Sequence, residues 1–398
     1  MTNRVLPIWA KGKIVLLLAL AVVLIGKLQV GAQCPAIELA SGLRLPLGIT
    51  QSNQDNLIVS ETGTRTSNTG RISVIDLTGN RRTLVDGLPS GINDVNEPAG
   101  PAGVVMRGRT LYVAIGVGDV AIAGPSQGTA VPNPNPPSSP LFSSVLAIHF
   151  SASVENTTAG FLLSLEDHQL LATGQKISLT NGAGDQITIQ MLANFTDYTP
   201  NPLPLVPANV RLSNPFDLVV IDDQLYVTDG GQNIVRRVDI PTSTVTTLAS
   251  FAPVMNPFFP FLGGPVIEAV PTGIRVVGGH LLVNLFSGVP FAPGFSRVQA
   301  VDPVTGVQTT FIGGRKTAID VLSLEDGDDT DYVVLQHASV GLFFGSPGVL
   351  LRFETPADSP TTIANCLTRP TSMVLDEKTG TFYVSEFGGR VVGLPLAP

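Results

Sequence analysis

Short apolar segments separated by polar turns recur along the chain at intervals of roughly fifty residues, the kind of period seen in repeat architectures. Each repeat opens with Pro or Ala, followed by a small residue or Asp, an apolar segment, a polar turn and a second apolar segment. The second apolar segments can be aligned as six copies: Asn56–Glu61, Thr110–Ile115, Gln224–Asp229, His280–Leu285, Asp331–Gln336 and Thr381–Glu386. Only the interval between the second and third copies is much longer.

Two further strands are expected in each repeat, joined by a recurring turn rich in Asp, Pro, Thr and Gly. The turn appears as Ile75–Gly79, Val238–Thr242 and Val301–Gly306. Pro fixes φ and Gly accepts positive φ, so these residues end one strand and start a hairpin. Four short strands repeated six times are typical of a β-propeller. The first two strands of each repeat are apolar on both faces because each blade packs between two neighbours. The sequence therefore predicts an all-β protein, a six-bladed β-propeller with four-stranded blades.

The last repeat contains only three strands before the chain stops at Pro398. A matching fourth strand occurs near the other end of the chain, at Ala36–Leu43. We expect this segment to pair with the last blade, which closes the ring and leaves no exposed edge strand. On this map Cys34 begins one outer strand and Cys366 ends the neighbouring one. They would then lie at opposite faces, so two free thiols are expected.

The first 32 residues have the pattern of a secretory signal peptide. Arg4, Lys11 and Lys13 precede an apolar segment, Ile14–Ile25, and the segment Val30–Ala32 offers small residues for cleavage after Ala32. The alternative is an uncleaved amino-terminal anchor. The apolar segment is too short to span a bilayer, so no stable membrane span is expected after cleavage. We predict a secreted or periplasmic protein whose residues 33–398 form a single propeller domain.

The long interval between repeats two and three is an insertion at about 121–212. Its first part is a Pro-rich loop, and Val145–Phe150 and Ile187–Phe195 are expected to complete blade two. Between them, Phe161–Leu165 and Ile177–Leu179 suggest a small appended hairpin. Such a segment is either a binding or lid element or a passive decoration.

Composition narrows the classes of function. Charged residues make up 14% of the chain, and 41 Gly and 32 Pro favour turns over long helices. The net charge is −8, without clusters of Lys or Arg. Nucleic-acid binding is set aside because it needs a basic surface to meet the phosphate backbone.

The channel mouth is the candidate site. The ends of second strands and the starts of first strands meet at one face beside the axis. The predicted ligand-binding residues there are Glu61, Asp217, Asp229, Asn284, Asp320, Gln336 and Glu386. Carboxylate and amide oxygens suit Ca²⁺, so Glu61, Asp229 and Glu386 are candidate metal ligands. The alternatives are that these acids cap turns by accepting backbone hydrogen bonds, or that they take part in catalysis.

Three motifs suggest chemistry but stand in the wrong context. Gly124–Gly128 matches a nucleophile elbow, yet it lies in a Pro-rich loop rather than a strand-to-helix turn. Gly116–Ala121 matches a dinucleotide loop without a following helix. The acidic segment Glu325–Asp331 lacks the pattern of an EF-hand. Of the four histidines, only His337 is placed near the mouth, where it is a candidate general base.

The order of short motifs resembles the ScyD/ScyE family over nearly the whole mature chain. The motifs are Gly87–Ser90, Gly100–Val104, Leu212–Phe216, Asp229–Asn233, Arg237–Asp239, Ala269–Thr272, Gly288–Phe291 and Ser296–Val298. This resemblance implies an exported propeller similar to NHL-repeat and gluconolactonase-like proteins, named for clusters that make the pigment scytonemin. It carries no defined catalytic residue. Leu285 and Ile115 interrupt the ring of acids expected of a gluconolactonase-like site.

Two classes of function follow from these patterns. The first is an exported module that binds a small molecule, a glycan or a protein at the channel mouth. The alternative is a lactonase or esterase in which a Ca²⁺-like cation at the mouth acts as a Lewis acid. A purely structural envelope protein is a third class.

Overall fold

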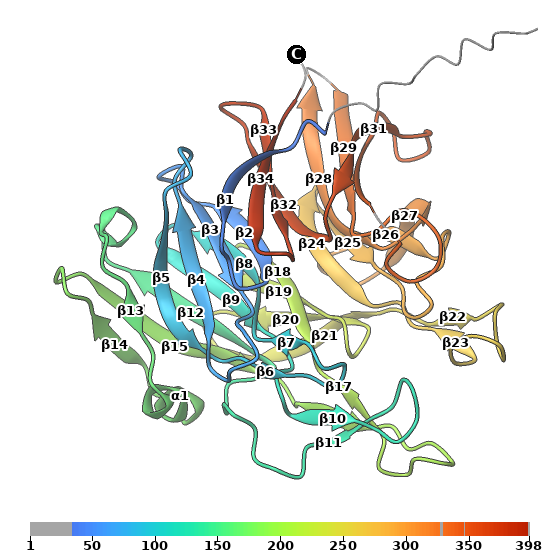
Figure 1. The fold of residues 1–398 in the computed structure, drawn as a ribbon, viewed down its shortest axis with the longest axis horizontal. Coiled ribbons are helices and arrows are strands. Elements are labelled where there is room, and N and C mark those ends of the chain that lie inside the picture. Colours follow the sequence, from blue (N-terminus) through green and yellow to red (C-terminus); the bar gives the residue numbers. More distant parts are fainter. Residues whose placement is uncertain (1–33, 327–328, 346, 397–398) are drawn as a thin grey trace, which may run out of the picture. The chain divides into compact units, whose positions relative to one another are not determined.

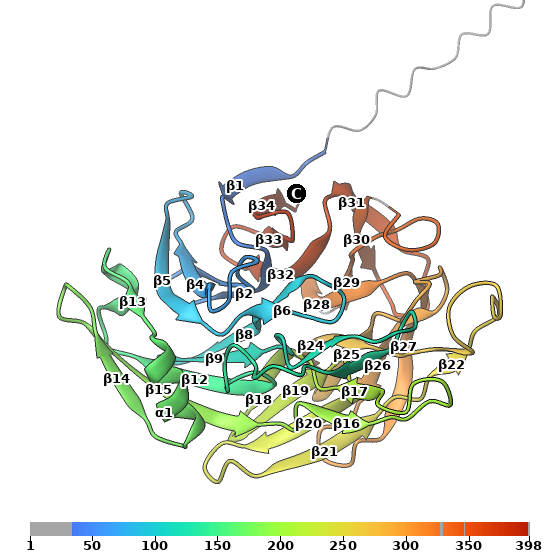
Figure 2. The ribbon, with the colours of Figure 1, turned by 60° about the horizontal axis from the view of Figure 1, so that its bottom comes forward.

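Six antiparallel sheets follow one another along the chain in the computed structural model, which describes residues 34–326, 329–345 and 347–396. Within each blade the four strands pair in sequence order from an innermost strand outward, except that the outermost strand of the last blade comes from the amino-terminal side of the chain. The innermost strands contact one another in sequence around the axis, and β32 of the last blade contacts β2 of the first. Figure 1 and Figure 2 show these sheets as the blades of a ring. The predicted six-bladed β-propeller is confirmed.

The strands of blades one to three, from the innermost outward, are β2 (Pro46–Gln51), β3 (Leu57–Glu61), β4 (Gly70–Ile75) and β5 (Arg81–Leu88); β8 (Pro101–Arg107), β9 (Thr110–Ile115), β12 (Ser144–Phe150) and β15 (Gln186–Asn194); and β18 (Pro215–Ile221), β19 (Gln224–Asp229), β20 (Ile234–Asp239) and β21 (Val245–Ser250). Those of blades four to six are β24 (Pro271–Val277), β25 (His280–Leu285), β26 (Ser296–Val301) and β27 (Gln308–Arg315); β28 (Ala318–Asp326), β29 (Asp329–Gln336), β30 (Gly348–Phe353) and β31 (Thr361–Leu367); and β32 (Pro370–Asp376), β33 (Thr381–Glu386), β34 (Arg390–Pro395) and β1 (Ile37–Ser41).

The Pro or Ala that opens each repeat is the first residue of each innermost strand. In all six blades the pairing of the first two strands shifts register just after this residue, which is the mark of a β-bulge. The second strands behind them are buried along nearly their whole length. Blades therefore pack on both faces, as the loss of alternation in the sequence predicts.

The ring is closed by the amino-terminal strand. β1 pairs antiparallel with β34, from Ile37 opposite Gly393 to Ser41 opposite Arg390. This confirms the closure predicted from the sequence. The predicted signal peptide lies outside the described residues.

The prediction of two free thiols is wrong. Cys34 and Cys366 form a disulfide with a Cα–Cα distance of 5.7 Å. The opposite-face argument treats outer strands as parallel to the axis, but neighbouring strands are rotated by roughly 20–25° and the twist accumulates across a blade. The chain ahead of β1 therefore reaches the outer strand of blade five, where Ala36 and Cys366 join the same apolar cluster.

The insertion completes blade two with β12 and β15, as predicted, and differs from a simple hairpin beyond them. Its remaining elements are η1 (Val154–Asn156), β13 (Phe161–Leu162), α1 (Leu165–Ala172) and β14 (Ile177–Thr180). β14 pairs with β15, whereas β13 adds in parallel to β5 of blade one. The insertion thus ties the outer edges of two blades together. A capping box at Ser164 and Asp167 starts the helix.

Four short hairpins project from the loops at one end of the ring. They are β6 (Gly91–Ile92) with β7 (Pro98–Ala99), β10 (Ala121–Ala123) with β11 (Ala130–Pro132), β16 (Tyr198–Pro200) with β17 (Val210–Leu212), and β22 (Val254–Met255) with β23 (Val266–Ile267). All four leave the same end, at the bottom of Figure 1. This end carries the channel mouth, and we call it the mouth face.

Candidate functional site

A cavity of about 300 Å³ lies at the mouth face, on the axis of the ring. All six innermost strands contribute the residue that follows their opening Pro or Ala. These residues are Leu47, Ala102, Phe216, Thr272, Ile319 and Thr371. Because one residue from every blade meets there, the cavity exists only when the ring is closed.

The floor of the cavity is closed by close approach of the innermost strands. A Cβ added at Gly48, Gly103 or Gly273 would collide with the backbone of the next blade. Below them, the Arg275 guanidinium binds Asp217 and Asp320 at 2.7 Å each. Asp320 also accepts hydrogen bonds from the Ser372 hydroxyl and the Met373 backbone N–H. Only a space of about 10 Å³ remains at this level, so a ligand that enters from the mouth stops here.

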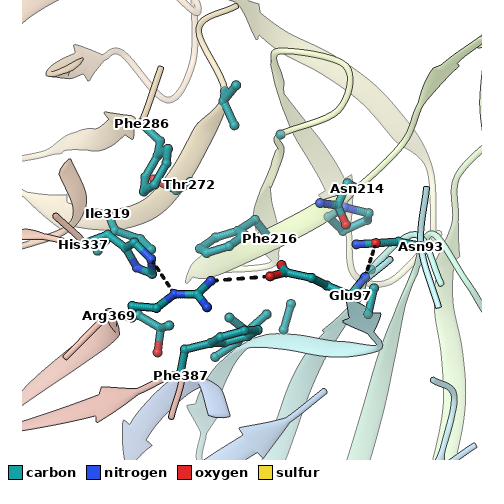
Figure 3. A pocket seen from close by; sticks show the side chains of 18 of the residues that line it. Asn93, Glu97, Asn214, Phe216, Thr272, Phe286, Ile319, His337, Arg369 and Phe387 are labelled. Carbon is teal, nitrogen blue, oxygen red and sulfur yellow. Dashed lines mark hydrogen bonds and ion pairs between the residues drawn. The ribbon is translucent and has the colours of Figure 1, made fainter. Parts of the chain in front are cut away.

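Aromatic rings form one wall of the cavity. Phe286 follows the end of β25, and its ring meets Phe291 edge-on at 5.7 Å and Phe344 at 6.2 Å. Phe291 and Phe344 are stacked, with ring centroids 4.6 Å apart. Phe216 rises from the start of β18 at the centre of the view in Figure 3. These faces suit a flat, largely apolar ligand.

Arg369 supplies positive charge to this apolar cavity. Its guanidinium carbon lies over the Phe387 ring at 4.6 Å and over Phe344 at 5.6 Å. Its other neighbour is Glu97, at 3.7 Å across the cavity (Figure 3). Arginine has five N–H donors, and within the described part of the chain only the Nε–H of Arg369 forms a hydrogen bond, to His337. Its Nη2 is ion-paired with Glu97, and within the described residues neither Nη group forms a hydrogen bond.

His337 is held in one neutral tautomer. Its Nδ1 lies 2.9 Å from the Pro370 carbonyl oxygen, which can only accept, so Nδ1 carries the proton. Its Nε2 then accepts from Arg369 at 3.3 Å. Burial lowers the pKa of His337 from 6.5 to about 4, and the charges of Arg369 and Lys316 act in the same direction. His337 therefore orients Arg369 and has no free nitrogen to serve as a general base.

The backbone of Arg369 takes positive φ, +49°, immediately before Pro370. Leu45 before Pro46 and Val270 before Pro271 do the same. The conformation is thus a recurring way to enter an innermost strand. This backbone conformation, which the three residues share, places residue 369 at the mouth. The guanidinium at this position is particular to the last blade.

Three predicted ligand residues, Glu61, Asp229 and Glu386, are buried and bound within their own blades. Glu61 pairs with Arg71 at 2.7 Å and Asp229 with Arg236 at 2.7 Å, and Glu386 binds Arg390.

Each of these acids also accepts a backbone N–H from the loop ahead of its innermost strand. The donors are Arg44, Asn214 and Thr368, respectively. Gln336 does the same with the Lys316 N–H, at 3.1 Å. Four predicted residues therefore cap loops, which is the alternative that the sequence left open.

The other three predicted residues lie nearer the axis but below the cavity. Asp217 and Asp320 share Arg275, as described above. Asn284 is fully buried and its Nδ2 donates to the Gly273 carbonyl at 3.2 Å. None of the seven predicted residues lines the 300 Å³ cavity.

The β-bulges explain this displacement. Side chains alternate along a strand, so a shift of one residue moves a side chain to the other face. The bulge after each opening Pro or Ala turns the next residue toward the mouth, and Asp217 and Asp320 come one position later. Just after the second strands, His337 and Phe387 follow the predicted Gln336 and Glu386 by one residue, Phe286 follows the predicted Asn284 by two, and all three line the cavity. The sequence predicts the positions of the strands in each repeat correctly. The spacing of the repeats does not indicate which side chains point into the cavity.

The donor set does not fit a metal ion at the predicted position. Each of the three candidate acids, Glu61, Asp229 and Glu386, is neutralised by an arginine. Among the residues that the structure describes, no group of three or more His, Cys, Asp or Glu side chains could hold a metal. No step of function is therefore assigned to a cation.

Comparisons with known proteins identify no family for this chain. No family model and no curated protein matches the chain, so the ScyD/ScyE resemblance remains a prediction. Among solved structures, a streptogramin B lyase is similar at 14% identity and TM-score 0.44, covering 91% of this chain and 97% of its own. A gluconolactonase of Xanthomonas campestris is 11% identical with TM-score 0.48, covering 91% and 89%. A protein of Bacteroides thetaiotaomicron described as a putative phosphatase is 12% identical with TM-score 0.48, covering 90% and 72%.

Proposed function

We propose that this protein is a propeller-based binding module for a small, flat, largely apolar molecule that carries a negatively charged or strongly accepting group. The observation that carries the proposal is the mouth cavity itself. It combines aromatic walls, a closed floor and Arg369, whose Nη groups form no hydrogen bond within the described residues and whose charge is paired with Glu97 at 3.7 Å, so a ligand anion would compete with Glu97 for the guanidinium. A volume of about 300 Å³ is at the lower end of the range of ligand pockets, which favours a small molecule over a glycan or a protein.

The chemistry of the lining residues supports binding more than hydrolysis. The hydroxyls of Thr272 and Thr371 donate to backbone carbonyls of the ring. Both nitrogens of His337 are engaged. The lining residues include one carboxylate, Glu97, which is paired with Arg369, and no cysteine, serine or aspartate. A metal-dependent lactonase or esterase would need a donor set that the candidate residues do not offer.

We further propose that the protein acts outside the reducing cytosol. The Cys34–Cys366 disulfide supports this location, because disulfides persist in exported proteins and are rare in the cytosol. The structure describes no helix long and apolar enough to span a membrane within residues 34–326, 329–345 and 347–396. Secretion into a host medium, with the amino end determined by mass spectrometry, tests export directly.

The binding proposal is tested by calorimetric titration with three probes of one shape: 2-naphthoate, neutral 2-naphthamide and cationic 2-(aminomethyl)naphthalene. We expect 2-naphthoate to bind most tightly. Arg369→Gln should weaken 2-naphthoate by roughly tenfold or more, because a charge-assisted hydrogen bond is lost, while changing 2-naphthamide much less.

The matched control is Arg107→Gln, which removes an exposed arginine paired with Asp223 at the opposite end of the ring. It should leave all three affinities unchanged. Equal affinity for the three probes, or no effect of Arg369→Gln, would reject the proposed site. A panel of lactones and esters serves as the second arm, and turnover that is lost in Glu97→Gln would favour the hydrolase instead.

A further inference from the structure

The loops of the mouth face contain long segments without any charged side chain. Five of them, residues 120–143, 198–210, 251–267, 286–296 and 337–345, have no Asp, Glu, Lys or Arg. We call these segments the uncharged rim. They come from the loops of blades two to five, including the hairpins β10–β11, β16–β17 and β22–β23.

Apolar side chains stand at the tips of the uncharged rim. The exposed fraction is 94% for Phe261, 89% for Leu205 and 76% for Met255. Every strongly exposed phenylalanine of the described chain lies in the rim, namely Phe259, Phe261, Phe343 and Phe344. Isolated exposed apolar residues are ordinary, but tips that project from separate loops at one end of a molecule are not.

Neighbouring loops of the rim are tied to one another. The Ala130 N–H donates to the Asn209 side chain at 3.1 Å, which joins β10–β11 to β16–β17. The Phe343 N–H donates to the Pro290 carbonyl at 2.8 Å, which joins the loops of blades four and five. These contacts restrain four of the five rim segments; neither involves residues 251–267, which carry Met255 and Phe261.

The backbone of the rim has few N–H donors, which lowers the cost of removing it from water. Half of the 32 prolines of the chain fall in the rim, although it is only about a fifth of the sequence. Proline has no N–H, so fewer donors must lose their water when these loops are buried. A protein partner would favour rim charges and a continuous flat area. Separate apolar tips without charge fit a lipid interface instead.

We propose that the mouth face binds the interfacial layer of a lipid bilayer by inserting the tips of the uncharged rim. The cavity opens on this same face, and Phe344 belongs both to its wall and to the rim. An apolar ligand would thus enter the cavity from the lipid without crossing bulk water. The bilayer proposal does not depend on the ligand proposal, because it rests on loops outside the cavity.

The test is sedimentation with vesicles of neutral phosphatidylcholine. The triple variant Leu205→Ser/Met255→Ser/Phe261→Ser removes the tips, and these side chains are exposed, so folding should be retained and is checked by thermal melting. We expect the unmodified protein to bind and the variant to bind at least a hundredfold more weakly, since burial of one large apolar side chain is worth roughly tenfold or more. Binding should be insensitive to salt, because the rim carries no charge.

The matched control is Val304→Ser/Val307→Ser, which removes two exposed apolar side chains, 75% and 65% exposed, from a turn at the opposite end of the ring. All proteins share the same amino end, so any affinity contributed by residues 1–33 is common to them. Equal binding by the triple variant and the control would overturn the proposal. So would a lack of vesicle binding, or a dimer in solution that the triple variant dissociates.

The same variants separate this proposal from the proposed function. Titration with 2-naphthoate in the absence of vesicles reports the cavity, and the triple variant should retain that affinity. Arg369→Gln should keep vesicle binding. A protein that binds vesicles but no probe would reject the ligand proposal and leave the lipid proposal intact.

Discussion

The two faces of the ring are built from the same repeat, but the loops at one face are mostly charged and those of the other include long segments without charge. At the face opposite the mouth, most turns contain at least one charged residue, namely 52–56, 76–80, 222–223, 302–307, 354–360 and 377–380, whereas Gly278–Gly279 has none. Asp76, Asp239 and Asp302 accept hydrogen bonds from backbone N–H groups and a threonine hydroxyl within their own turns. At the mouth face, five loop segments have no charge at all.

The difference shows which end of the ring is available for recognition. Charged turns that bind their own backbone are satisfied in water and have little to offer a partner. The mouth face instead exposes apolar tips around a cavity and leaves an arginine with unused donors. In a repeat fold, departures from the repeated turn therefore locate the functional end better than the repeat itself.

The largest expected effect comes from the boundary between the two faces, at Arg275. Arg275→Met leaves Asp217 and Asp320 buried without their cation, which should lower the free energy of unfolding by about 3–5 kcal/mol. Urea unfolding measures the change. The triple variant that adds Asp217→Asn and Asp320→Asn should recover a large part of it. A loss below about 1 kcal/mol in Arg275→Met would show that the network contributes little.

The second expected effect tests whether both faces depend on closure of the ring. Cys34→Ser/Cys366→Ser should lower the free energy of unfolding by about 2–4 kcal/mol, because the disulfide closes a very long loop. The reduced unmodified protein should unfold like the variant. If reduction leaves the unfolding midpoint unchanged, then strand pairing between β1 and β34 is sufficient to close the ring.

The third prediction uses pH to distinguish the faces. The pKa of His337 is lowered to about 4 in the folded protein, so the unfolded chain binds a proton first as the pH falls. Stability is therefore complete above pH 6.5 and is lost as the pH falls from 6.5 to 4, by roughly 3 kcal/mol at most. His337→Gln keeps a donor and an acceptor but does not titrate, so it should lose less stability across this window. Buried His168, whose pKa burial also lowers, is unchanged in both proteins.

At the face opposite the mouth, the pH range over which a titrating group changes stability lies lower. Hydrogen bonds from Thr78 and Asn80 lower the pKa of Asp76 from 3.8 to about 2. Stability from this turn is present above pH 3.8 and is lost as the pH falls to 2. Asp76 is largely in contact with solvent, so the effect is small. Asp76→Asn should flatten only this lower window, measured by the same urea series. If the free energy of unfolding depends on pH in the same way in His337→Gln, Asp76→Asn and the unmodified protein, the two proposed pH ranges are wrong.

The smallest expected effect concerns metal ions. The acids Glu61, Asp229 and Glu386 are already neutralised by arginines, so addition of Ca²⁺ or of EDTA should leave the melting temperature unchanged. A clear upward shift with Ca²⁺ that disappears in Glu61→Gln would restore the cation site predicted from the sequence.

The ring could be predicted from the sequence, whereas the site could be predicted only in part. The apolar second strands and the opening Pro or Ala fixed the number and phase of the blades, because packing between blades demands them. The Ala36–Leu43 match was sufficient to predict closure. The bulges were not visible, since a bulge changes the direction of side chains without changing their spacing. The predicted residues Asp217 and Asp320 therefore fall one residue beyond the cavity-lining Phe216 and Ile319, while His337 was placed at the mouth and Phe286 and Phe387 were not predicted.

Arg369 and the disulfide were missed for a different reason. Both depend on how loops and twisted outer strands meet in space, between residues with no fixed separation in the sequence. One signal was present: Phe291 in Gly288–Phe291 and Phe216 in Leu212–Phe216 lie in motifs that the family resemblance singled out, and both line the cavity. Aromatic residues in the loops that follow second strands would have indicated the wall.

Closure of the ring by β1 also sets an order for assembly. The first strand to leave the ribosome finds its partner, β34, only after the last blade has been synthesised. The two segments are separated by nearly the whole chain, the kind of distant pairing that slows folding. Until then β1 has no partner strand, and an unpaired edge strand can pair with another chain. A chain truncated anywhere before β34 would stay in that vulnerable state.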